Sequence, residues 1–293
     1  MRKPLLDLSA VTLLCVETRD PKLAHFAIQK CMKQAHFSRV VLITDLAKVN
    51  NPQSAQVNKK ETEQAIARLS GIEYVEAPPI KTTKEYSNFL LTGLRQYVFS
   101  THVLVIQWDS FIIHPELWTD VFLKYDYIGA VWPHHPETPV GNGGFSLRST
   151  KLLDALVSPE IPKRHPEDFC ICIDNRERLE REFDIRFAPT ELAEKFAVER
   201  STWHPAFGFH GLFNFARVFD SAEFPEFLHR LNDDYLSGVD AYDLIDYLML
   251  SHRPAEAQMV RRRVQFAWKW RRRFFQAKIN MFLAKHEGDR SQS

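Results

Sequence analysis

The feature that most constrains the fold is an alternation of apolar, β-rich runs with helical periodicity over the first two-thirds of the chain. Strand patterns are clearest at 11–18, 39–45, 72–80 and 102–110, and helical patterns follow at 21–35 and 83–98, with Thr83 as the expected cap of the second helix. The run HVLVIQWDS at 102–110 is continuously apolar until it ends, which is typical of a strand buried on both faces. This order predicts an α/β fold with helices packed on a central sheet.

The later part of the chain predicts a change of organisation. Short strands are expected at 125–132 and 143–149, and one helix is expected over 166–181, because a proline and two acids open it. From about residue 221 onward the periodicity is helical. We therefore expect an α/β domain over 1–220 and a helical C-terminal region over 221–293.

Composition places few further limits on the function. With 293 residues and 45% hydrophobic content, the chain can bury a large core. The apolar start is interrupted by Asp7 and is interpreted as the first strand, and no run reaches the roughly 20 apolar residues of a membrane span. The four cysteines are expected to be buried and reduced, as in a cytoplasmic protein.

Polar residues follow the expected strands at their carboxyl ends, where open α/β sheets bind ligands. These strand-end residues are Thr18, Arg19, Asp45, Gln107, Trp108 and Asp109. A carboxylate such as Asp109 at the end of a buried strand can join a hard cation to phosphate oxygens. An acid at this position also suits a helix cap or a turn.

Glycines gather in one segment, TPVGNGGFSLRST at 138–150. The chain has ten glycines, and three of them, Gly141, Gly143 and Gly144, fall within four positions. Such a cluster indicates either a backbone that something approaches closely or a tight hairpin.

The order of six segments carries a family resemblance. The segments QWD, YDYIGAVW, VGNGGFSLRS, PED, APTELAEKFAVE and FGFHG follow one another from the end of the expected strand at 102–110 onward, and the resemblance covers roughly residues 10 to 215. This order resembles the GT-A glycosyltransferases, and most of all a bacterial family catalogued as a domain of unknown function. The resemblance implies a Rossmann-like fold with a mixed central sheet flanked by helices.

The resemblance also implies roles for single residues. Asp109 matches the second aspartate of the Asp-x-Asp motif and His210 matches a C-terminal histidine, and together these hold Mn²⁺ or Mg²⁺ against the donor diphosphate. Asp168 of PED matches the general base of inverting members. Asn142, Gly143 and Gly144 match a loop beside the donor sugar, where glycines would leave room for a hexose and Asn142 would bond its hydroxyls.

One position departs from the family pattern, and several others stay open. Gln107 replaces the first acid of the motif, so metal affinity should be lower, and its amide can instead bond ribose or water. Thr18, Arg19, Asp45, Gln107 and Trp108 are the expected contacts to the nucleotide of the donor. Glu167 is interpreted as a helix cap or acceptor contact, and Trp132 as an acceptor contact or core packing.

The function that this resemblance implies is transfer of a sugar from a nucleotide-diphosphate donor to a hydroxyl of a glycan or lipid-linked acceptor, with inversion, in envelope or surface polysaccharide synthesis. Two alternatives are a nucleotidyltransferase that uses the same metal site and a non-catalytic module that binds sugar nucleotides or glycans. Gln107 favours the second alternative, whereas the pairing of Asp168 with His210 favours an enzyme.

The C-terminal tail is strongly basic. Residues 258–286 hold nine Lys and Arg and no acid, and because the chain carries +1, the rest carries −8. On one continuous helix over 260–286, an apolar stripe would face a basic one; the stripes comprise Val264, Trp268, Phe275, Ile279 and Phe282, and Arg262, Lys269 and Arg273. Such a helix suits either an anionic membrane surface, at the inner face of the plasma membrane, or packing on the domain. Nucleic acid is not an expected partner.

Overall fold

The structure is a computed structural model, and it describes residues 4–49, 71–264, 268–270, 272–273 and 275–277. The chain forms two compact units, Met1–His210 and Gly211–Ser293. The division falls directly after His210, so this candidate metal ligand is the last residue of the first unit.

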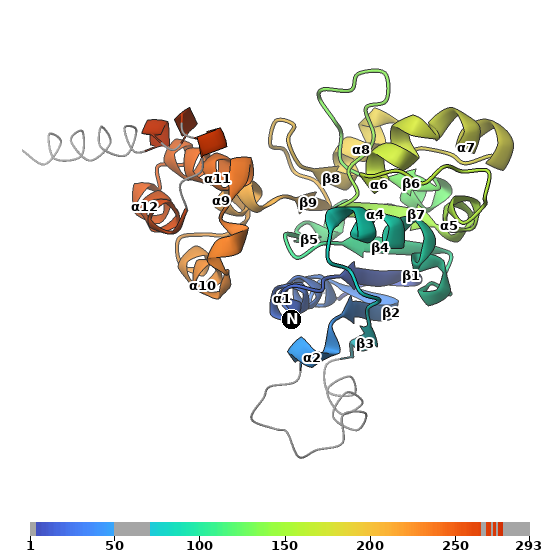
Figure 1. Cartoon of the computed structure of the whole chain (residues 1–293), viewed down its shortest axis with the longest axis horizontal. Coiled ribbons are helices and arrows are strands. Elements are labelled where there is room, and N and C mark those ends of the chain that lie inside the picture. Colours follow the sequence, from blue (N-terminus) through green and yellow to red (C-terminus); the bar gives the residue numbers. More distant parts are fainter. Residues whose placement is uncertain (1–3, 50–70, 265–267, 271, 274, 278–293) are drawn as a thin grey trace, which may run out of the picture. The chain divides into compact units, whose positions relative to one another are not determined.

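The first unit is built on a six-stranded sheet with the order β3-β2-β1-β4-β7-β6. Its strands are β1 (Leu6–Val16), β2 (Ala35–Thr44), β3 (Glu73–Glu76), β4 (His102–Ile106), β6 (Tyr127–Ile128) and β7 (Phe145–Ser149). The first four are parallel, whereas β7 runs antiparallel to both β4 and β6. Figure 1 shows the sheet from β3 at the bottom to β6 at the top, with helices around it. The expected α/β fold with a mixed central sheet is confirmed.

Local sequence explains the first helices. In α1 (Pro21–Met32), Asp20 caps the start and Pro21 occupies the first turn, as expected. In α4 (Thr83–Thr92), the cap is Thr82 and not Thr83, because Thr82 Oγ1 accepts from the Glu85 amide while the Glu85 carboxylate accepts from the Thr82 amide. The short helices α2 (Leu46–Val49) and α5 (Thr150–Leu156) and 3₁₀ turns at Leu94–Tyr97, Pro115–Leu117 and Asp120–Lys124 complete this part.

The core of the first unit follows from strand burial. Every residue of β4 is buried, in agreement with its continuous apolar pattern. Leu14, Val41 and Val103 of three neighbouring strands pack with Leu90 of α4 in one hydrophobic cluster. Cys15, Cys31, Cys170 and Cys172 are all buried and free, as the sequence predicted.

A second, three-stranded sheet was not predicted. It has the order β5-β9-β8 and contains β5 (Ser110–Ile112), β8 (Ala197–Val198) and β9 (Gly208–His210). Because β5 and β9 pair antiparallel, Ser110 lies opposite His210. This pairing places the end of the FGFHG segment beside the residue that precedes β5, Asp109.

The single helix predicted over 166–181 is wrong. The segment instead forms α6 (Glu167–Phe169), a π-helical turn at Cys170–Asp174 and α7 (Arg176–Phe183), and α8 (Thr190–Phe196) follows. The Asn175 amide donates to the Cys170 carbonyl, which is the five-residue spacing of a π turn. The candidate base Asp168 therefore lies in a short helical segment of its own.

The second unit is helical, as expected. It contains α9 (Phe215–Val218), α10 (Glu223–Arg230), α11 (Gly238–Leu250) and α12 (Pro254–Arg263), with 3₁₀ turns at Leu212–Asn214, Asp233–Tyr235 and Trp268–Trp270. In the part of the chain that the structure describes, no helix has both the length and the apolar character that crossing a bilayer requires.

The predicted continuous helix over 260–286 is wrong at its start. Val264 is extended, with ψ 122°, so α12 ends at Arg263. Arg263 forms an ion pair with Asp233 at 2.6 Å, and Arg273 pairs with Asp243 at 2.8 Å. These pairs use two basic side chains within the second unit and favour the packed alternative for the tail. Ile279 and Phe282 of the apolar stripe lie outside the described residues.

Candidate functional site

The glycine-rich segment is a buried loop that Asn142 holds in shape. Asn142 has a φ of 61°, a left-handed conformation that asparagine tolerates better than most residues. Its Oδ1 accepts from the amides of Gly144 at 3.2 Å and Phe145 at 3.4 Å, and its own carbonyl accepts from the Tyr127 hydroxyl at 3.0 Å. Since Asn142 is only 5% exposed, its amide serves the loop rather than a sugar hydroxyl, contrary to the expectation.

The glycines are needed because other side chains of the protein approach them. A Cβ on Gly143 would lie 2.1 Å from Glu167 Oε1, and a Cβ on Gly144 would lie 2.2 Å from His210 Nε2. The space that a Cβ would take is thus filled from within the molecule, and this alone requires glycine at both positions. The loop backbone separates two charged groups, one around Glu167 and one around His210.

The group around His210 consists of two carboxylates and two amides, and we call it the His210 cluster: Gln107, Asp109, Asn142, Glu199 and His210. His210 Nε2 lies 3.5 Å from Asp109 Oδ1 and 3.2 Å from Gln107 Oε1. His210 Nδ1 lies 3.1 Å from Glu199 Oε1 and 3.1 Å from Asn142 Nδ2. The structure therefore brings together Asp109 and His210, which come from motifs a hundred residues apart.

The two carboxylates determine the charge of the imidazole. Burial disfavours the charged ring, but the negative charges of Asp109 and Glu199, together with the hydrogen bond to Glu199, favour the imidazolium more strongly, so the pKa of His210 is raised well above its ordinary value. Within the contacts described, this one imidazole faces two carboxylates.

The His210 cluster fits a divalent cation. Asp109 Oδ1 is buried and accepts no hydrogen bond within the described part of the chain. Asp109 Oδ1, Gln107 Oε1 and His210 Nε2 form a set of possible metal ligands. Nε2 lies 3.2 Å from Gln107 Oε1 and 3.5 Å from Asp109 Oδ1, close to the ~3 Å between neighbouring ligands of an octahedral ion. Among the described residues, no three His, Cys, Asp or Glu side chains are placed to hold an ion. Phosphate or water oxygens would have to complete the shell.

The group on the other side of the loop is a buried ion pair. Arg148 is fully buried, and its Nη2 lies 3.4 Å from Glu167 Oε1. Arg148 Nε donates to Ser146 Oγ at 3.0 Å, and Nη2 also reaches the Gly143 carbonyl at 3.4 Å. Burial raises the pKa of Glu167, and the charge of Arg148 opposes this rise. Glu167 is 6% exposed, and its role as an acceptor contact stays a prediction.

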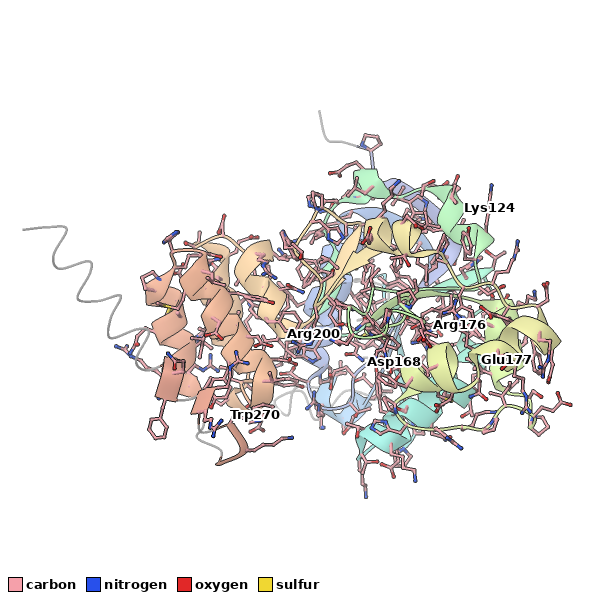
Figure 2. All side chains as sticks on the ribbon, turned by 90° about the horizontal axis from the view of Figure 1, so that it is seen from above. Lys124, Asp168, Arg176, Glu177, Arg200 and Trp270 are labelled. Carbon is pink, nitrogen blue, oxygen red and sulfur yellow. The ribbon has the colours of Figure 1, made fainter. Side chains whose placement is uncertain are left out.

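Asp168 is held beside this ion pair. It is the second residue of α6, half-buried, and its Oδ1 accepts from the Phe169 amide at 2.9 Å. Figure 2 shows Asp168 toward the middle of the first unit, whereas Lys124 and Glu177 lie at its periphery. Asp168 is linked to the glycine loop through its neighbour Glu167, which lies against Gly143.

Trp132 belongs to the packing around the loop. It is 7% exposed, and its ring centroid lies 5.0 Å from Phe169 and 5.5 Å from His135. A Cβ on Gly141 would lie 2.3 Å from this ring. Trp132 therefore packs in the core around the loop, and its role as an acceptor contact stays a prediction.

An open pocket of about 350 Å³ lies at the carboxyl ends of β1 and β4. It is lined by residues 16–19, 80–83, 86 and 107–108, which include four of the predicted donor contacts: Thr18, Arg19, Gln107 and Trp108. Its volume lies within the range of small-molecule sites. The fifth predicted contact, Asp45, is not among the lining residues; its Oδ1 accepts from the Ala47 amide at 3.0 Å at the start of α2.

Gln107 connects the pocket with the His210 cluster. Its Nε2 donates to the Tyr86 hydroxyl in the pocket at 3.1 Å, while its Oε1 faces His210 Nε2. Because the amide has one donor end and one acceptor end, it serves both regions at once. A ligand in the pocket would lie next to the donor atoms of the cluster.

Sequence reasoning missed two residues of this arrangement. Glu199 lies within the AVE end of a quoted segment, directly after β8, and its position after a strand was a signal like that of Asp109. Arg148 lies within GGFSLRS on β7, where its pattern gives no sign that a cation is buried.

Comparison with known proteins finds one family, and it matches just under half of the chain. A family described as "Protein of unknown function (DUF5672)" matches residues 70–210. No curated protein matches the chain.

Solved structures similar to this chain include three transferases. Glucosyl-3-phosphoglycerate synthase from Mycobacterium tuberculosis, solved with Mn²⁺ and UDP, has 13% identity and a TM-score of 0.38, covering 63% of this chain and 76% of that one. The mannosyltransferase PcManGT from Pyrobaculum calidifontis, solved with GDP-Man and Mn²⁺, has 12% identity and a TM-score of 0.40, covering 94% and 71%. A cytidylyltransferase from Leptospira borgpetersenii has 12% identity and a TM-score of 0.35, covering 87% and 98%.

Proposed function

We propose that this protein is a glycosyltransferase that uses a nucleotide-diphosphate sugar as donor. The observation that carries the proposal is the position of the pocket, which Gln107 joins to the buried pair of Asp109 and His210. A donor whose nucleotide lies in the pocket can place its diphosphate beside these two side chains. The order of the QWD, VGNGGFSLR, PED and FGFHG segments supports the same assignment.

Asp109 and His210, with the Gln107 amide, would hold Mn²⁺ or Mg²⁺. When bound, the ion supplies the positive charge that stabilises the leaving diphosphate. In the pocket, Arg19 and Lys81 provide cationic side chains for an anionic ligand, and Thr18 and Trp108 provide a hydroxyl and an aromatic face. Asp45, outside the pocket lining, is not needed for this binding mode.

Asp168 is the proposed general base. It would accept the proton of the acceptor hydroxyl as that oxygen attacks the anomeric carbon from the face opposite the leaving group, which inverts the configuration. The Arg148–Glu167 pair fixes the start of α6 and so holds the backbone that carries Asp168. The acceptor would be a glycan or a lipid-linked sugar of an envelope or surface polysaccharide.

A panel of nucleotide sugars tests this function. We expect one donor to raise the melting temperature in the presence of Mn²⁺ and to be hydrolysed slowly without acceptor. Asp168→Asn should lower transfer by about 10²- to 10⁴-fold and leave donor binding nearly unchanged. Equal turnover of this variant and the wild type would remove Asp168 from the role of base.

The second candidate, a non-catalytic binding module, is favoured by one observation. Gln107 brings a neutral amide to a position where a carboxylate would bind a cation more strongly. Under this alternative a nucleotide sugar raises the melting temperature, but neither hydrolysis nor transfer follows for any donor with Mn²⁺ present. Turnover that depends on Asp168 would exclude it.

A further inference from the structure

Among the described residues, four polar side chains contact His210, and they make opposite demands on its two nitrogens. At Nε2, the neighbours are the acceptor atoms Asp109 Oδ1 at 3.5 Å and Gln107 Oε1 at 3.2 Å. At Nδ1, Glu199 Oε1 at 3.1 Å requires a proton on the ring, whereas Asn142 Nδ2 at 3.1 Å requires a lone pair. One imidazole cannot satisfy both Nδ1 neighbours in the same state.

Two features decide between the neighbours of Nδ1. A bond from Nδ1–H to a carboxylate is charge-assisted and stronger than a bond between a neutral amide and a neutral ring. The Asn142 side chain is also fixed by another task, because its Oδ1 accepts from the amides of Gly144 and Phe145. Glu199 is therefore the partner that determines where the Nδ1 proton lies.

A proton on Nδ1 has a direct consequence for the opposite nitrogen. In a ring with one proton, Nε2 then carries the lone pair, and that lone pair points toward Asp109 and Gln107. Replacing the Nε2 proton by a cation leaves the bond from Nδ1–H to Glu199 unchanged. Proteins commonly orient metal-binding histidines in this way, through a carboxylate on the nitrogen that does not bind the ion.

We propose that Glu199 is a positioning residue, which orients His210 and keeps Nε2 available to a divalent cation shared with Asp109. This inference rests on the proposed function, because it assigns a role to Glu199 in the same cation site. Glu199 is itself largely buried, with 13% of its side chain exposed, so the bond is shielded from water. β8 and β9 pair side by side and carry Glu199 and His210 at their ends.

The test compares Mn²⁺ affinity in the wild type, Glu199→Gln and Asp109→Asn, measured by electron paramagnetic resonance on the full chain without donor. Glutamine keeps the shape of the side chain but removes the charge that holds the Nδ1 proton. We expect Glu199→Gln to weaken Mn²⁺ binding about 10- to 100-fold. Glu256→Gln is the matched control, because Glu256 is also a buried carboxylate paired with a cation, Arg253 at 3.1 Å, and should bind Mn²⁺ like the wild type.

A spectroscopic measurement on the wild type keeps the proposal testable if Glu199→Gln does not fold. With Zn²⁺ as a diamagnetic probe, the ¹⁵N signals of His210 should show a protonated Nδ1 and a metal-bound Nε2. A metal-bound Nδ1, or a proton on Nε2 in the loaded protein, overturns the role of Glu199. A merely structural Glu199 would not select one nitrogen.

The outcomes separate this inference from the proposed function. If Asp109→Asn loses Mn²⁺ while Glu199→Gln binds it like the wild type, the role of Glu199 is wrong and the cation site stands. If the wild type binds no Mn²⁺ at all, both are overturned. Weaker binding in both variants, with Glu256→Gln unchanged, supports both.

Discussion

The two sides of the Gly143–Gly144 backbone differ in their balance of charge. On one side the fully buried Arg148 faces Glu167, one cation with one carboxylate. On the other side His210 faces both Asp109 and Glu199. Both groups touch the loop closely enough that neither glycine has room for a Cβ.

This difference separates a structural pair from a site that can take a ligand. The buried pair joins one cation to one carboxylate, and it fixes the loop and the start of α6. In the His210 cluster two carboxylates face one imidazole, and the buried Asp109 Oδ1 accepts no hydrogen bond in the described structure, which favours a cation. The loop therefore holds the two groups apart while it touches both.

The largest expected effect on stability comes from removing Arg148 from its buried ion pair with Glu167. Arg148→Met leaves the Glu167 carboxylate buried without its cation, which should lower the free energy of unfolding by about 3–5 kcal/mol. Urea unfolding measures this loss. Adding Glu167→Gln removes the stranded charge, so the double variant should recover much of the stability; a double variant no more stable than Arg148→Met would show that charge is not the cause.

Substitutions at the two glycines test the two groups separately, because Gly143 lies against Glu167 and Gly144 lies against His210. Gly143→Ala and Gly144→Ala should each lower the free energy of unfolding by about 1–3 kcal/mol, because the new methyl group displaces Glu167 or His210. Mn²⁺ affinity should fall in Gly144→Ala, whose methyl group meets His210 Nε2, and stay near the wild-type value in Gly143→Ala. Calorimetric titration with Mn²⁺ measures this, and equal losses in both variants would contradict separate sides.

The Mn²⁺ affinity of the His210 cluster should also depend on pH. Since the pKa of His210 is raised well above its ordinary value, protons compete with Mn²⁺ for Nε2 up to a higher pH than at an ordinary histidine. Affinity should therefore rise with pH, by up to ~tenfold per unit below that pKa, with release of a proton. Titrations in buffers of different ionisation enthalpy count the protons, and a constant affinity over the range would speak against His210 as a ligand.

The smallest expected effect concerns the hydrogen bond that joins Gln107 of the His210 cluster to Tyr86 in the pocket. Tyr86→Phe removes the hydroxyl that accepts from Gln107 Nε2, which should lower the free energy of unfolding by about 0.5–1.5 kcal/mol. Thermal unfolding with and without a nucleotide sugar measures it. A loss of several kcal/mol would mean that Tyr86 does more than orient Gln107.

Much of the fold could be predicted from the sequence because its strands are long and apolar. The expected strands at 11–18, 39–45 and 102–110 fall on β1, β2 and β4, whose burial leaves a clear pattern. β5 and β8 have three and two residues, too few to show a period, so the second sheet was missed. The π turn at Cys170–Asp174 depends on one hydrogen-bond shift that no residue pattern marks.

The candidate site likewise contains residues that could be predicted from the sequence and residues that could not. Asp109 and His210 lie in short, distinctive segments, so their meeting could be expected from a resemblance. Glu199 reaches His210 only through the pairing of β8 with β9, a non-local contact that spacing does not reveal. The approach of Glu167 and His210 to Gly143 and Gly144 could not be predicted, because a sequence shows that something approaches a glycine and does not show what.

The most direct test of the cation site is anomalous diffraction from crystals grown with Mn²⁺ and a nucleoside diphosphate. The account predicts one strong manganese peak within ligand distance of both Asp109 Oδ1 and His210 Nε2, on the Oε1 side of Gln107. A crystal with the nucleotide bound and no manganese beside these two atoms, or with manganese held elsewhere, would contradict it.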